Sequence, residues 1–365
     1  MKFKTSSSIA GITPYEAGKP LTELCREYHI HSAVKLASNE NPLGFSTMVH
    51  AAVLKSLSGM NRYPEPVDHD LCCALAKKYR VAPENIVLGN GSDDLIALLA
   101  HAFLNPGDQA LMPLPSFLMY EISVKTAKGV PVMVPLDRFD TNLCALAQNI
   151  SPHTRMVFVT NPFNPTGSAI TRDAFQEFAA KIPSDVLIVV DEAYMEFVRD
   201  PDVFNSLENP LQDPRIVTLR TFSKAYGLAG FRIGYGIMDK EAARILNRIR
   251  QPFNVNGLAQ TAAKAALADQ AFLAHSIDVI HQGIDFLTAE LTAMGLKPLP
   301  TQANFLMVDV KTDATEIFQK LLRQGVIVRS MKSYGFDTFL RVNAGTFAEN
   351  QAFITALKTV LESDT

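Results

Sequence analysis

The sequence predicts an α/β protein in which a large domain holds a doubly wound, mostly parallel sheet and a smaller α+β domain follows it. Three observations support this fold class. Short apolar runs alternate with helical stretches between residues 81 and 238, and the last third of the chain has longer helical patterns. The chain has 365 residues, of which 47% are hydrophobic and 19% charged. That composition provides a core and excludes a disordered or fibrous chain, and the length fits two domains or one large α/β domain.

The strands expected in the large domain are apolar along their whole length, as strands covered on both faces are. They are predicted at residues 86–88, 109–112, 130–135, 156–160, 186–190, 216–219 and 231–237. Helices are predicted at residues 71–78, 93–104, 116–127, 171–182 and 240–249. Since helices separate most consecutive strands, we expect the strands to run mostly parallel.

The last third of the chain begins with a nearly continuous helical pattern over residues 258–294. Strands at 304–310, 326–329 and 339–342 follow, with two more helices between and after them. Those helices open at Asp313 and Thr346, each with a glutamate three residues later, which is the spacing of a capping box. We therefore predict an N-terminal segment at 1–40 that joins the small domain, a large domain at 41–255 and a small domain at 256–365.

Charge and patterning exclude several classes of protein. The formal net charge is −3, without a basic patch, so a nucleic-acid partner is not expected. No segment approaches the roughly 18 apolar residues of a membrane helix, and the N-terminus lacks the apolar stretch of a signal peptide. The four cysteines have no zinc spacing, and residues 68–70 (Asp-His-Asp) are predicted to be a polar turn rather than a metal site. We expect a cytoplasmic protein without a metal.

Two polar segments follow predicted strands, where ligand sites of α/β proteins lie. Gly91, Ser92 and Asp93 open a helix whose free N–H groups and dipole can hold an anion, although an ordinary capped helix start is the alternative. The second segment, NPFNPTG at 161–167, is a turn fixed by Pro and Gly. It holds the amide of Asn164 as a rigid donor for a ligand oxygen, unless the turn is only structural.

Two further segments carry charged side chains. Asp191 lies just past a buried apolar strand, where a carboxylate needs a cationic or N–H partner unless it merely caps a helix. Tyr194 would face the same pocket if the chain turns helically. The most specific segment is TFSKAYGLAGFRIGY at 221–235, in which Lys224 lies among hydroxyl-bearing and small residues and Arg232 follows eight residues later.

Together the four segments provide an amine, a carboxylate, an anion cradle and hydrogen-bond donors. Pyridoxal 5′-phosphate (PLP) needs this set, because its aldehyde condenses with a lysine, its ring nitrogen needs an anion, and its phosphate needs an anion site. A dinucleotide site is the competing interpretation. The run Gly89-Asn90-Gly91 lacks the third glycine of that motif, since position 94 is Asp94.

The motifs NPxNPTG, DEAY and TFSKAYGLAGFRIGY resemble those of the fold-type-I aminotransferases, and specifically the histidinol-phosphate aminotransferase family. The resemblance covers nearly the whole chain. It includes ITPYEAGKP near the start, LASNENPLG at 36–44, RYPEP at 62–66, PSFLMY at 115–120 and LRVNAGT at 340–346. The fold that it implies is the PLP-transferase fold of type I.

The resemblance implies a role for each residue around the cofactor. Lys224 forms the imine with PLP and, once freed, moves the proton between the substrate Cα and the cofactor. Asp191 pairs with the pyridinium nitrogen, and Tyr194 and Asn164 hydrogen-bond the phenolic oxygen. The residues implied at the phosphate are Gly91, Ser92, Asp93, Ser223 and Arg232.

Two aromatic residues have implied roles that depend on their surroundings. Phe117 stands where an aromatic ring, commonly tyrosine, stacks on the cofactor, so the stacking is kept and a hydroxyl is lost. Tyr63 would reach the cofactor phosphate of the neighbouring subunit. The resemblance therefore implies a homodimer with shared active sites.

The substrate side is implied by Tyr15, Arg329 and Arg341, which match the positions that hold the anionic end of the substrate, and by Asn41, which lies in the segment closing over the pocket. Both arginines also lie at predicted strand ends in the small domain, where guanidinium groups could hold an anionic amine or a dicarboxylate.

The implied activity is reversible transamination between histidinol phosphate and 2-oxoglutarate in histidine biosynthesis. The substrates are thus a phosphorylated amino alcohol and glutamate or 2-oxoglutarate. An aminotransferase for phenylalanine and tyrosine is the nearest alternative, and a lyase of the threonine-phosphate decarboxylase type is a more distant one. A dinucleotide oxidoreductase would need the missing glycine, and a non-catalytic relative would be expected to lack Lys224 or Asp191.

Overall fold

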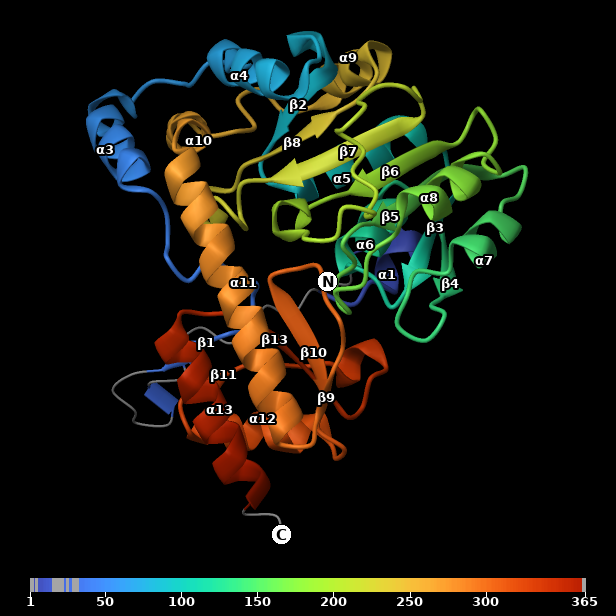
Figure 1. Ribbon diagram of the computed structural model, residues 1–365. Coiled ribbons are helices and arrows are strands. Elements are labelled where there is room, and N and C mark those ends of the chain that lie inside the picture. Colours follow the sequence, from blue (N-terminus) through green and yellow to red (C-terminus); the bar gives the residue numbers. More distant parts are fainter. Residues whose placement is uncertain (1–2, 4–5, 15–22, 24–25, 28–32, 363–365) are drawn as a thin grey trace.

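A seven-stranded sheet forms the centre of the larger part of the molecule (Figure 1). The computed structural model describes residues 3, 6–14, 23, 26–27 and 33–362. The strands lie in the order β2-β8-β7-β6-β5-β3-β4, and all run in one direction except β8. Their bounds are β2 Ile86–Gly89, β3 Gln109–Leu114, β4 Val130–Pro135, β5 Thr154–Thr160, β6 Leu187–Asp191, β7 Ile216–Thr221 and β8 Gly234–Ile237. The predicted doubly wound, mostly parallel sheet is confirmed.

Helices cover both faces of this sheet because the side chains of each strand alternate between two apolar layers. In β5, Met156 and Phe158 belong to one layer, and Val157 and Val159 to the other. The first layer packs against helices α5 (Ser92–Phe103), α6 (Leu118–Thr126) and α9 (Lys240–Ile249). The second packs against α7 (Leu143–Gln148) and α8 (Arg172–Ala179). The carboxyl ends of the parallel strands stay open for a ligand.

The strand predicted at 231–237 is shorter than expected. Residues Ala229–Phe231 form a 3₁₀ turn, and β8 begins only at Gly234. Arg232 between them has a φ of 61°, in the left-handed region, and this conformation cannot continue a strand. The change of direction points the Arg232 side chain toward the start of α5, where it pairs with Asp93.

The helical pattern predicted at 258–294 is two helices and not one. Helix α10 (Gly257–Ala268) packs against α3 (Thr47–Ser56) and α4 (His69–Tyr79), and α11 (Gln270–Ala293) continues as the long helix that reaches the C-terminal part (Figure 1). Asp269 separates them, because its carboxylate accepts a hydrogen bond from the Phe272 N–H and caps α11. The other N-terminal elements described are α1 (Ser7–Ala10) and the 3₁₀ turn Leu57–Gly59.

The C-terminal part holds a four-stranded antiparallel sheet in the order β12-β13-β10-β9. Its strands are β9 Lys297–Pro298, β10 Phe305–Asp309, β12 Arg329–Ser330 and β13 Phe339–Asn343, and its helices are α12 Ala314–Arg323 and α13 Phe347–Glu362. Thr346 and Glu349 form the predicted capping box, with reciprocal hydrogen bonds of 2.7 and 3.3 Å. Asp313 caps α12 through the backbone N–H groups of Thr315 and Glu316.

The strand predicted at 326–329 is divided between two sheets. β11 (Val326–Ile327) pairs in parallel with β1 (Val34–Lys35), whereas Arg329 pairs with Arg341 of β13. The residues before Val328 pair with β1, and those after it pair with β13. The pairing brings this stretch of the N-terminal segment against the C-terminal part. The domain boundaries themselves stay a prediction, since one apolar core runs from α4 through α11 to α13.

Within the described ranges, no helix combines the length and the apolar character that spanning a membrane requires. The same ranges hold no group of three or more His, Cys, Asp or Glu side chains placed to hold a metal ion. The predicted polar turn at 68–70 instead starts a helix: Asp68 accepts a hydrogen bond of 2.9 Å from the Leu71 N–H and caps α4.

Candidate active site

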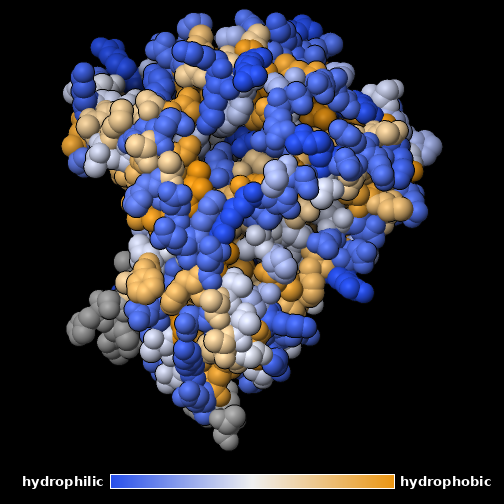
Figure 2. Space-filling view, in the orientation of Figure 1, coloured by the Kyte–Doolittle hydropathy of each residue, from blue (hydrophilic) through white to orange (hydrophobic). Residues whose placement is uncertain are grey.

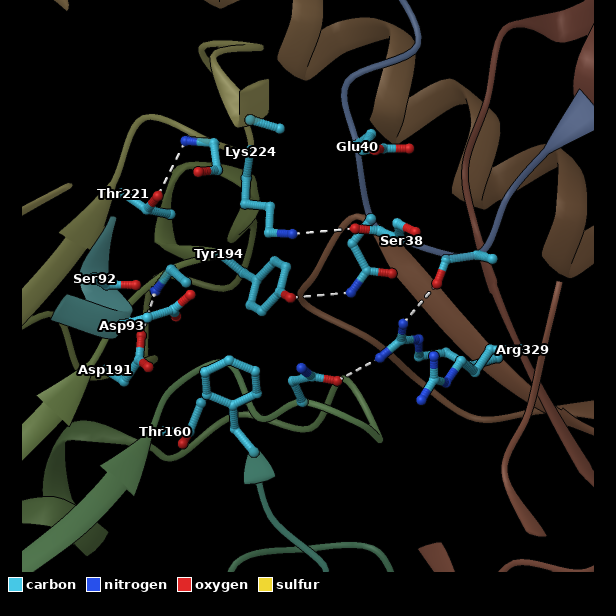
Figure 3. Close-up of a pocket in the computed structure, with 18 of the residues that line it drawn as sticks. Ser38, Glu40, Ser92, Asp93, Thr160, Asp191, Tyr194, Thr221, Lys224 and Arg329 are labelled. Atoms are coloured by element: carbon cyan, nitrogen blue, oxygen red, sulfur yellow. Dashed lines mark hydrogen bonds between the residues drawn. The ribbon is translucent and has the colours of Figure 1, made fainter. Parts of the chain in front are cut away.

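A cavity of about 250 Å³ lies where the carboxyl ends of β5, β6 and β7 face the C-terminal sheet (Figure 3). Thr160, Asp191 and Thr221 end these three strands and line the cavity. The other lining residues come from the segment before α3, the starts of α5 and α6, the loops after β5, β6 and β7, strands β12 and β13, and the turn between these two strands. They are Ala37, Ser38, Asn39, Glu40, Ser92, Asp93, Phe117, Tyr120, Asn164, Ala193, Tyr194, Ser223, Lys224, Ala229, Arg232, Arg329, Tyr334 and Arg341.

Lys224 extends into this cavity from the loop after β7, with Asp191 and Asp93 on one side and Arg329 on the other (Figure 3). Its Nζ donates a 3.2 Å hydrogen bond to the carbonyl of Ser38 and lies 5.6 Å from the centre of the Tyr194 ring. Burial, and then the positive charge of Arg341, lower the pKa of Lys224 to about 8. A larger share of this amine is therefore neutral at physiological pH than for a surface lysine.

The loop that carries Lys224 is held by a close backbone approach. Gly227 has a φ of 71°, and a Cβ at this position would lie 1.8 Å from the carbonyl oxygen of Gly44. Only glycine accepts both the conformation and the contact. Asn41 adds a second connection, since its Nδ2 donates to the carbonyl of Ala225 at 2.9 Å and to Ser276 Oγ at 3.0 Å.

Asp191 is 5% exposed, at the end of β6. Its Oδ2 accepts a 2.7 Å hydrogen bond from the Tyr120 hydroxyl, and its Oδ1 accepts one of 3.2 Å from the Ala193 N–H. Burial raises the pKa of this carboxyl to about 6. Among the residues that the structure describes, no lysine, arginine or histidine forms an ion pair with it. Asp191 is thus a buried anion that a cationic ligand group would stabilise.

The start of α5 forms an anion cradle together with Arg232. Gly91 caps the helix with a φ of 83°, and a Cβ there would lie 2.5 Å from Arg232 Nη2. The cradle therefore requires glycine at this position. Arg232 Nη2 contacts Asp93 Oδ2 at 3.2 Å, and the guanidinium partly offsets the effect of burial, which raises the pKa of Asp93. The helix N-terminus and the guanidinium both favour an anionic ligand.

The two arginines predicted on the substrate side are direct neighbours across β12 and β13. Arg341 is 7% exposed and donates to Asn164 Oδ1 at 2.6 Å and to the carbonyl of Ala37 at 2.9 Å. Because Oδ1 of Asn164 accepts from Arg341, its amide nitrogen remains the group that can donate to a ligand. Arg329 lines the opposite wall from Lys224 (Figure 3). This wall is positively charged.

Tyr194 is buried on the wall between these charged groups. Its hydroxyl accepts a 3.0 Å hydrogen bond from Asn39 Nδ2, and its ring packs edge-on against Phe305. Burial raises the pKa of Tyr194, so the hydroxyl keeps its proton at neutral pH. The phenol is thereby left as a donor that faces the cavity.

Three of the predicted site residues that the structure describes do not line the cavity. Gly91 lies at the helix start behind Ser92 and does not line the cavity. Asn41 does not line it either, and its side-chain amide connects the Lys224 loop to α11. Its implied role toward the substrate stays a prediction. Tyr63 is 82% exposed and stacks on Phe253 with ring centres 4.6 Å apart, outside the cavity of its own chain. Tyr15 lies outside the described residues.

Several lining residues were not predicted. Asn39 and Glu40 belong to the SNENP stretch, in which only Asn41 was singled out. Tyr120 follows Phe117 by three residues, and this spacing places both on one side of α6 and is a usable signal. Ser38 contributes only its backbone carbonyl to Lys224, and no side-chain pattern marks such a contact.

The Aminotransferase class I and II family matches residues 32–357 of this chain. The chain is 44% identical over 359 residues to the histidinol-phosphate aminotransferase of Moorella thermoacetica, covering 98% of this chain and 93% of that protein. It is also 44% identical to histidinol-phosphate aminotransferase 2 of Carboxydothermus hydrogenoformans, covering 97% and 98%.

Solved structures agree with this relationship. The histidinol-phosphate aminotransferase of Sinorhizobium meliloti, solved in complex with PLP, superposes with a TM-score of 0.90 at 28% identity and covers 100% of this chain and 99% of that one. The aspartate aminotransferase of Thermus thermophilus with maleate shares the fold, with a TM-score of 0.83 at 24% identity over 99% and 98% of the chains. The chain is therefore an aminotransferase of class I and II, a PLP-dependent enzyme. Within that class it belongs to the histidinol-phosphate aminotransferase family.

The residues present fit PLP. Asp191 is a buried carboxylate without a cationic partner among the described residues, and Lys224 is a buried amine with a lowered pKa in the same cavity. The cradle of α5 and Arg232 offers N–H donors and positive charge for a phosphate. Phe117 provides an aromatic face on the cavity wall.

Proposed function

We propose that this chain transfers an amino group reversibly between histidinol phosphate and 2-oxoglutarate, in histidine biosynthesis. One observation carries the proposal: the amine of Lys224 and the carboxylate of Asp191 share a cavity with the guanidinium groups of Arg329 and Arg341. The first two groups suit PLP and the last two suit an anionic substrate. The names of the relatives agree with this substrate.

PLP, when bound, withdraws electrons from the substrate Cα so that its proton can leave. Lys224 is the group that takes and returns this proton, because its lowered pKa allows the neutral amine to act as a base. Asp191 holds the proton on the ring nitrogen. Tyr194 and the amide nitrogen of Asn164 would donate to the phenolic oxygen of bound PLP, and Phe117 would offer its ring face to the cofactor.

The anion cradle would hold the cofactor phosphate through the Ser92 and Asp93 N–H groups, Ser223 and Arg232. The substrate phosphate is a second anion, with a charge of roughly −1.5 to −2. Arg329 and Arg341 supply two positive charges on the facing wall, which match this phosphate better than a single carboxylate. Glutamate, with two carboxylates, fits the same pair.

We propose in addition that the chain acts as a homodimer with shared sites. The segment from α3 to residue 67 carries a row of exposed apolar side chains, consistent with the light and orange surface over α3 in Figure 2. They are Met48, Leu54, Leu57, Met60, Tyr63 and Val67. An apolar surface of this kind suits contact with a second copy, in which Tyr63 would reach the partner's cofactor phosphate. A cytoplasmic location stays a prediction.

A substrate panel on the purified protein tests the reaction. Histidinol phosphate should give a higher kcat/KM than phenylalanine, tyrosine or leucine, with 2-oxoglutarate as acceptor. Arg329→Gln should lower kcat/KM for histidinol phosphate by about 10- to 200-fold and much less for phenylalanine, because Arg341 can hold a carboxylate alone. A wild-type enzyme that prefers phenylalanine would contradict the proposal.

Mixing the inactive Lys224→Ala variant with a Tyr63→Phe variant tests the shared site. Lys224→Ala and Tyr63→Phe chains, when mixed and allowed to exchange, should form heterodimers with one site that carries neither substitution. Activity equal to the sum of the two separate variants would show that each site is built from one chain.

A further inference from the structure

Tyr120 is a buried tyrosine of α6 that the proposed mechanism does not use. It is 0% exposed, and its hydroxyl donates to Asp191 Oδ2 at 2.7 Å and lies 2.9 Å from Thr160 Oγ1. We propose that Tyr120 is a positioning residue that keeps the Asp191 carboxylate ionised and oriented toward the ring nitrogen of PLP. The inference rests on the proposed role of Asp191 and adds the group that makes this role possible.

The Tyr120 hydroxyl has one proton, and this fixes the direction of its hydrogen bonds with Asp191 and Thr160. An ionised carboxylate only accepts, so the single proton of the Tyr120 hydroxyl points to Asp191. The hydroxyl of Thr160 must then donate to the Tyr120 oxygen. The result is a chain from Thr160 through Tyr120 to Asp191 in which each bond polarises the next, and it ends on the anion.

The ring of Tyr120 cannot turn away from this position. It stacks on Phe158 with ring centres 4.5 Å apart and an angle of 11°, and it meets the edge of Phe117 at 5.7 Å and 86°. Phe117 and Tyr120 lie one helical turn apart at the start of α6. The same turn of helix therefore sets both the aromatic face offered to the cofactor and the donor that holds Asp191.

The charges around Asp191 show why a donor is needed. Burial raises its pKa to about 6, and the nearby carboxyls of Asp93 and Glu192 act in the same direction. The Tyr120 hydroxyl and the Ala193 N–H lower the pKa, and Tyr120 contributes more than the backbone does.

The charges of the two carboxylates near Asp191 are themselves compensated by arginines. Asp93 is paired with Arg232, and Glu192 is paired with Arg220. Tyr194 lies on the same wall with its hydroxyl protonated. Without the Tyr120 hydroxyl, a larger fraction of Asp191 would be protonated at neutral pH and unable to hold the ring proton of PLP.

Tyr120→Phe tests the inference because it removes the hydroxyl and keeps the stacked ring. The dissociation constant of PLP from the apo-protein, measured by fluorescence titration between pH 5 and pH 9, gives a readout that does not depend on turnover. We expect about 10- to 100-fold weaker binding at pH 7. The pH below which binding weakens should also move upward by about one pH unit.

Two further variants make the result specific. Tyr79→Phe removes the hydroxyl of a partly buried tyrosine, which lies 2.7 Å from that of Tyr235 and away from the cavity, and this variant should bind PLP as the wild type does. In an Asp191→Asn background, Tyr120→Phe should change the dissociation constant less than about threefold, since the two residues act through one another.

Unchanged PLP binding in Tyr120→Phe would overturn the inference, and so would an equal loss at every pH. Failure of the proposed function is separately visible, because it would appear as wild-type protein that binds PLP but does not turn over histidinol phosphate. A thermal unfolding curve of Tyr120→Phe close to that of the wild type would confirm that the loss of binding is local.

Discussion

Asp191 and Glu192 are neighbours in the sequence and both are buried, but their surroundings solve the problem of a buried carboxylate in opposite ways. Glu192 is 0% exposed and lies 2.8 Å from the guanidinium of Arg220, which also contacts Glu196 at 3.1 Å. Asp191 has two hydrogen bonds and, among the described side chains, no ion pair. Burial raises the pKa of both. The negative charge of Glu192 is neutralised within the protein, whereas that of Asp191 remains available to a cationic ligand group.

The largest expected effect concerns the cavity that contains Asp191 and Lys224. Lys224→Ala removes both the covalent link to PLP and the proton carrier, so kcat/KM should fall by more than about 10⁴-fold, beyond the usual contribution of a general acid–base group. We expect the wild type with bound PLP to be yellow and the purified variant to lack this colour.

Lys264→Ala is a matched control, because it removes a lysine that is ion-paired with Asp68 outside the cavity. It should keep nearly full activity. A Lys224→Ala enzyme that retains more than about 1% of wild-type kcat/KM would contradict the assignment.

The next largest effect should come from removing the ion pair between Glu192 and Arg220. Arg220→Met leaves Glu192 and Glu196 buried without their cation, and the free energy of unfolding should fall by about 3–5 kcal/mol. Denaturant unfolding of the apo-protein measures this loss. Arg172→Met, which breaks an exposed pair with Glu208, should cost no more than about 1 kcal/mol. Similar losses for the two variants would remove the distinction between the buried and the exposed pair.

Asp191→Asn should raise the stability of the apo-protein at pH 7, whereas Arg220→Met should lower it. The pKa of Asp191 is about 6 in the fold against an ordinary 3.8, so the folded state binds more protons than the unfolded state between these pH values. Stability is therefore lost as the pH rises through that window, and at pH 7 the full cost, about 3 kcal/mol, is present. The variant removes the charge, so the apo-protein should unfold at a higher temperature at pH 7 while its affinity for PLP falls.

Glu192→Gln provides the contrast for this experiment, because it leaves Arg220 with less compensation and should lower the unfolding temperature. If both amides changed stability in the same direction, the two carboxylates would not differ in the way described.

The smallest expected effect concerns the pH dependence of cofactor uptake. Lys224 must be neutral to react with the aldehyde of PLP, and its pKa is about 8. The association rate of PLP with the apo-protein should rise about tenfold for each pH unit from pH 6.5 to 7.5 and level off above pH 8. Stopped-flow absorbance measures it. A rate that does not change between pH 6.5 and pH 8 would mean that another step controls uptake.

Much of the fold could be predicted from the sequence, because the strands of the central sheet are buried on both faces and are apolar throughout. Two element boundaries were predicted wrongly because a single residue changes the course of the backbone there. Asp269 divides a helical pattern by capping the second helix, and Arg232 ends a turn with a positive φ. The division of 326–329 between two sheets depends on the pairing of β11 with β1, which lies nearly 300 residues earlier and is not contained in a local pattern.

The site was predicted in its charged residues and less well in the groups that support them. Lys224, Asp191 and Arg232 follow strands or turns in motifs that stand out locally. Tyr120, in contrast, lies inside an ordinary helix, and Ser38 acts through a backbone carbonyl. Asn41 was assigned to the substrate because its segment borders the pocket, and the sequence does not reveal that its side chain turns to the Lys224 loop.

The order in which the chain is synthesised gives the N-terminal wall of the cavity a further consequence. The segment with Ser38 and Asn39 is held by residues that are made roughly 300 positions later: β1 pairs with β11, and the backbone N–H of Asn39 donates to Asn343 Oδ1 at 3.1 Å. On the ribosome this wall cannot assemble until β13 has emerged, although the large sheet can already have formed. A ribosome-bound chain that ends before β11 should therefore fail to retain PLP, and stable loading becomes an event that follows the synthesis of β11 and β13.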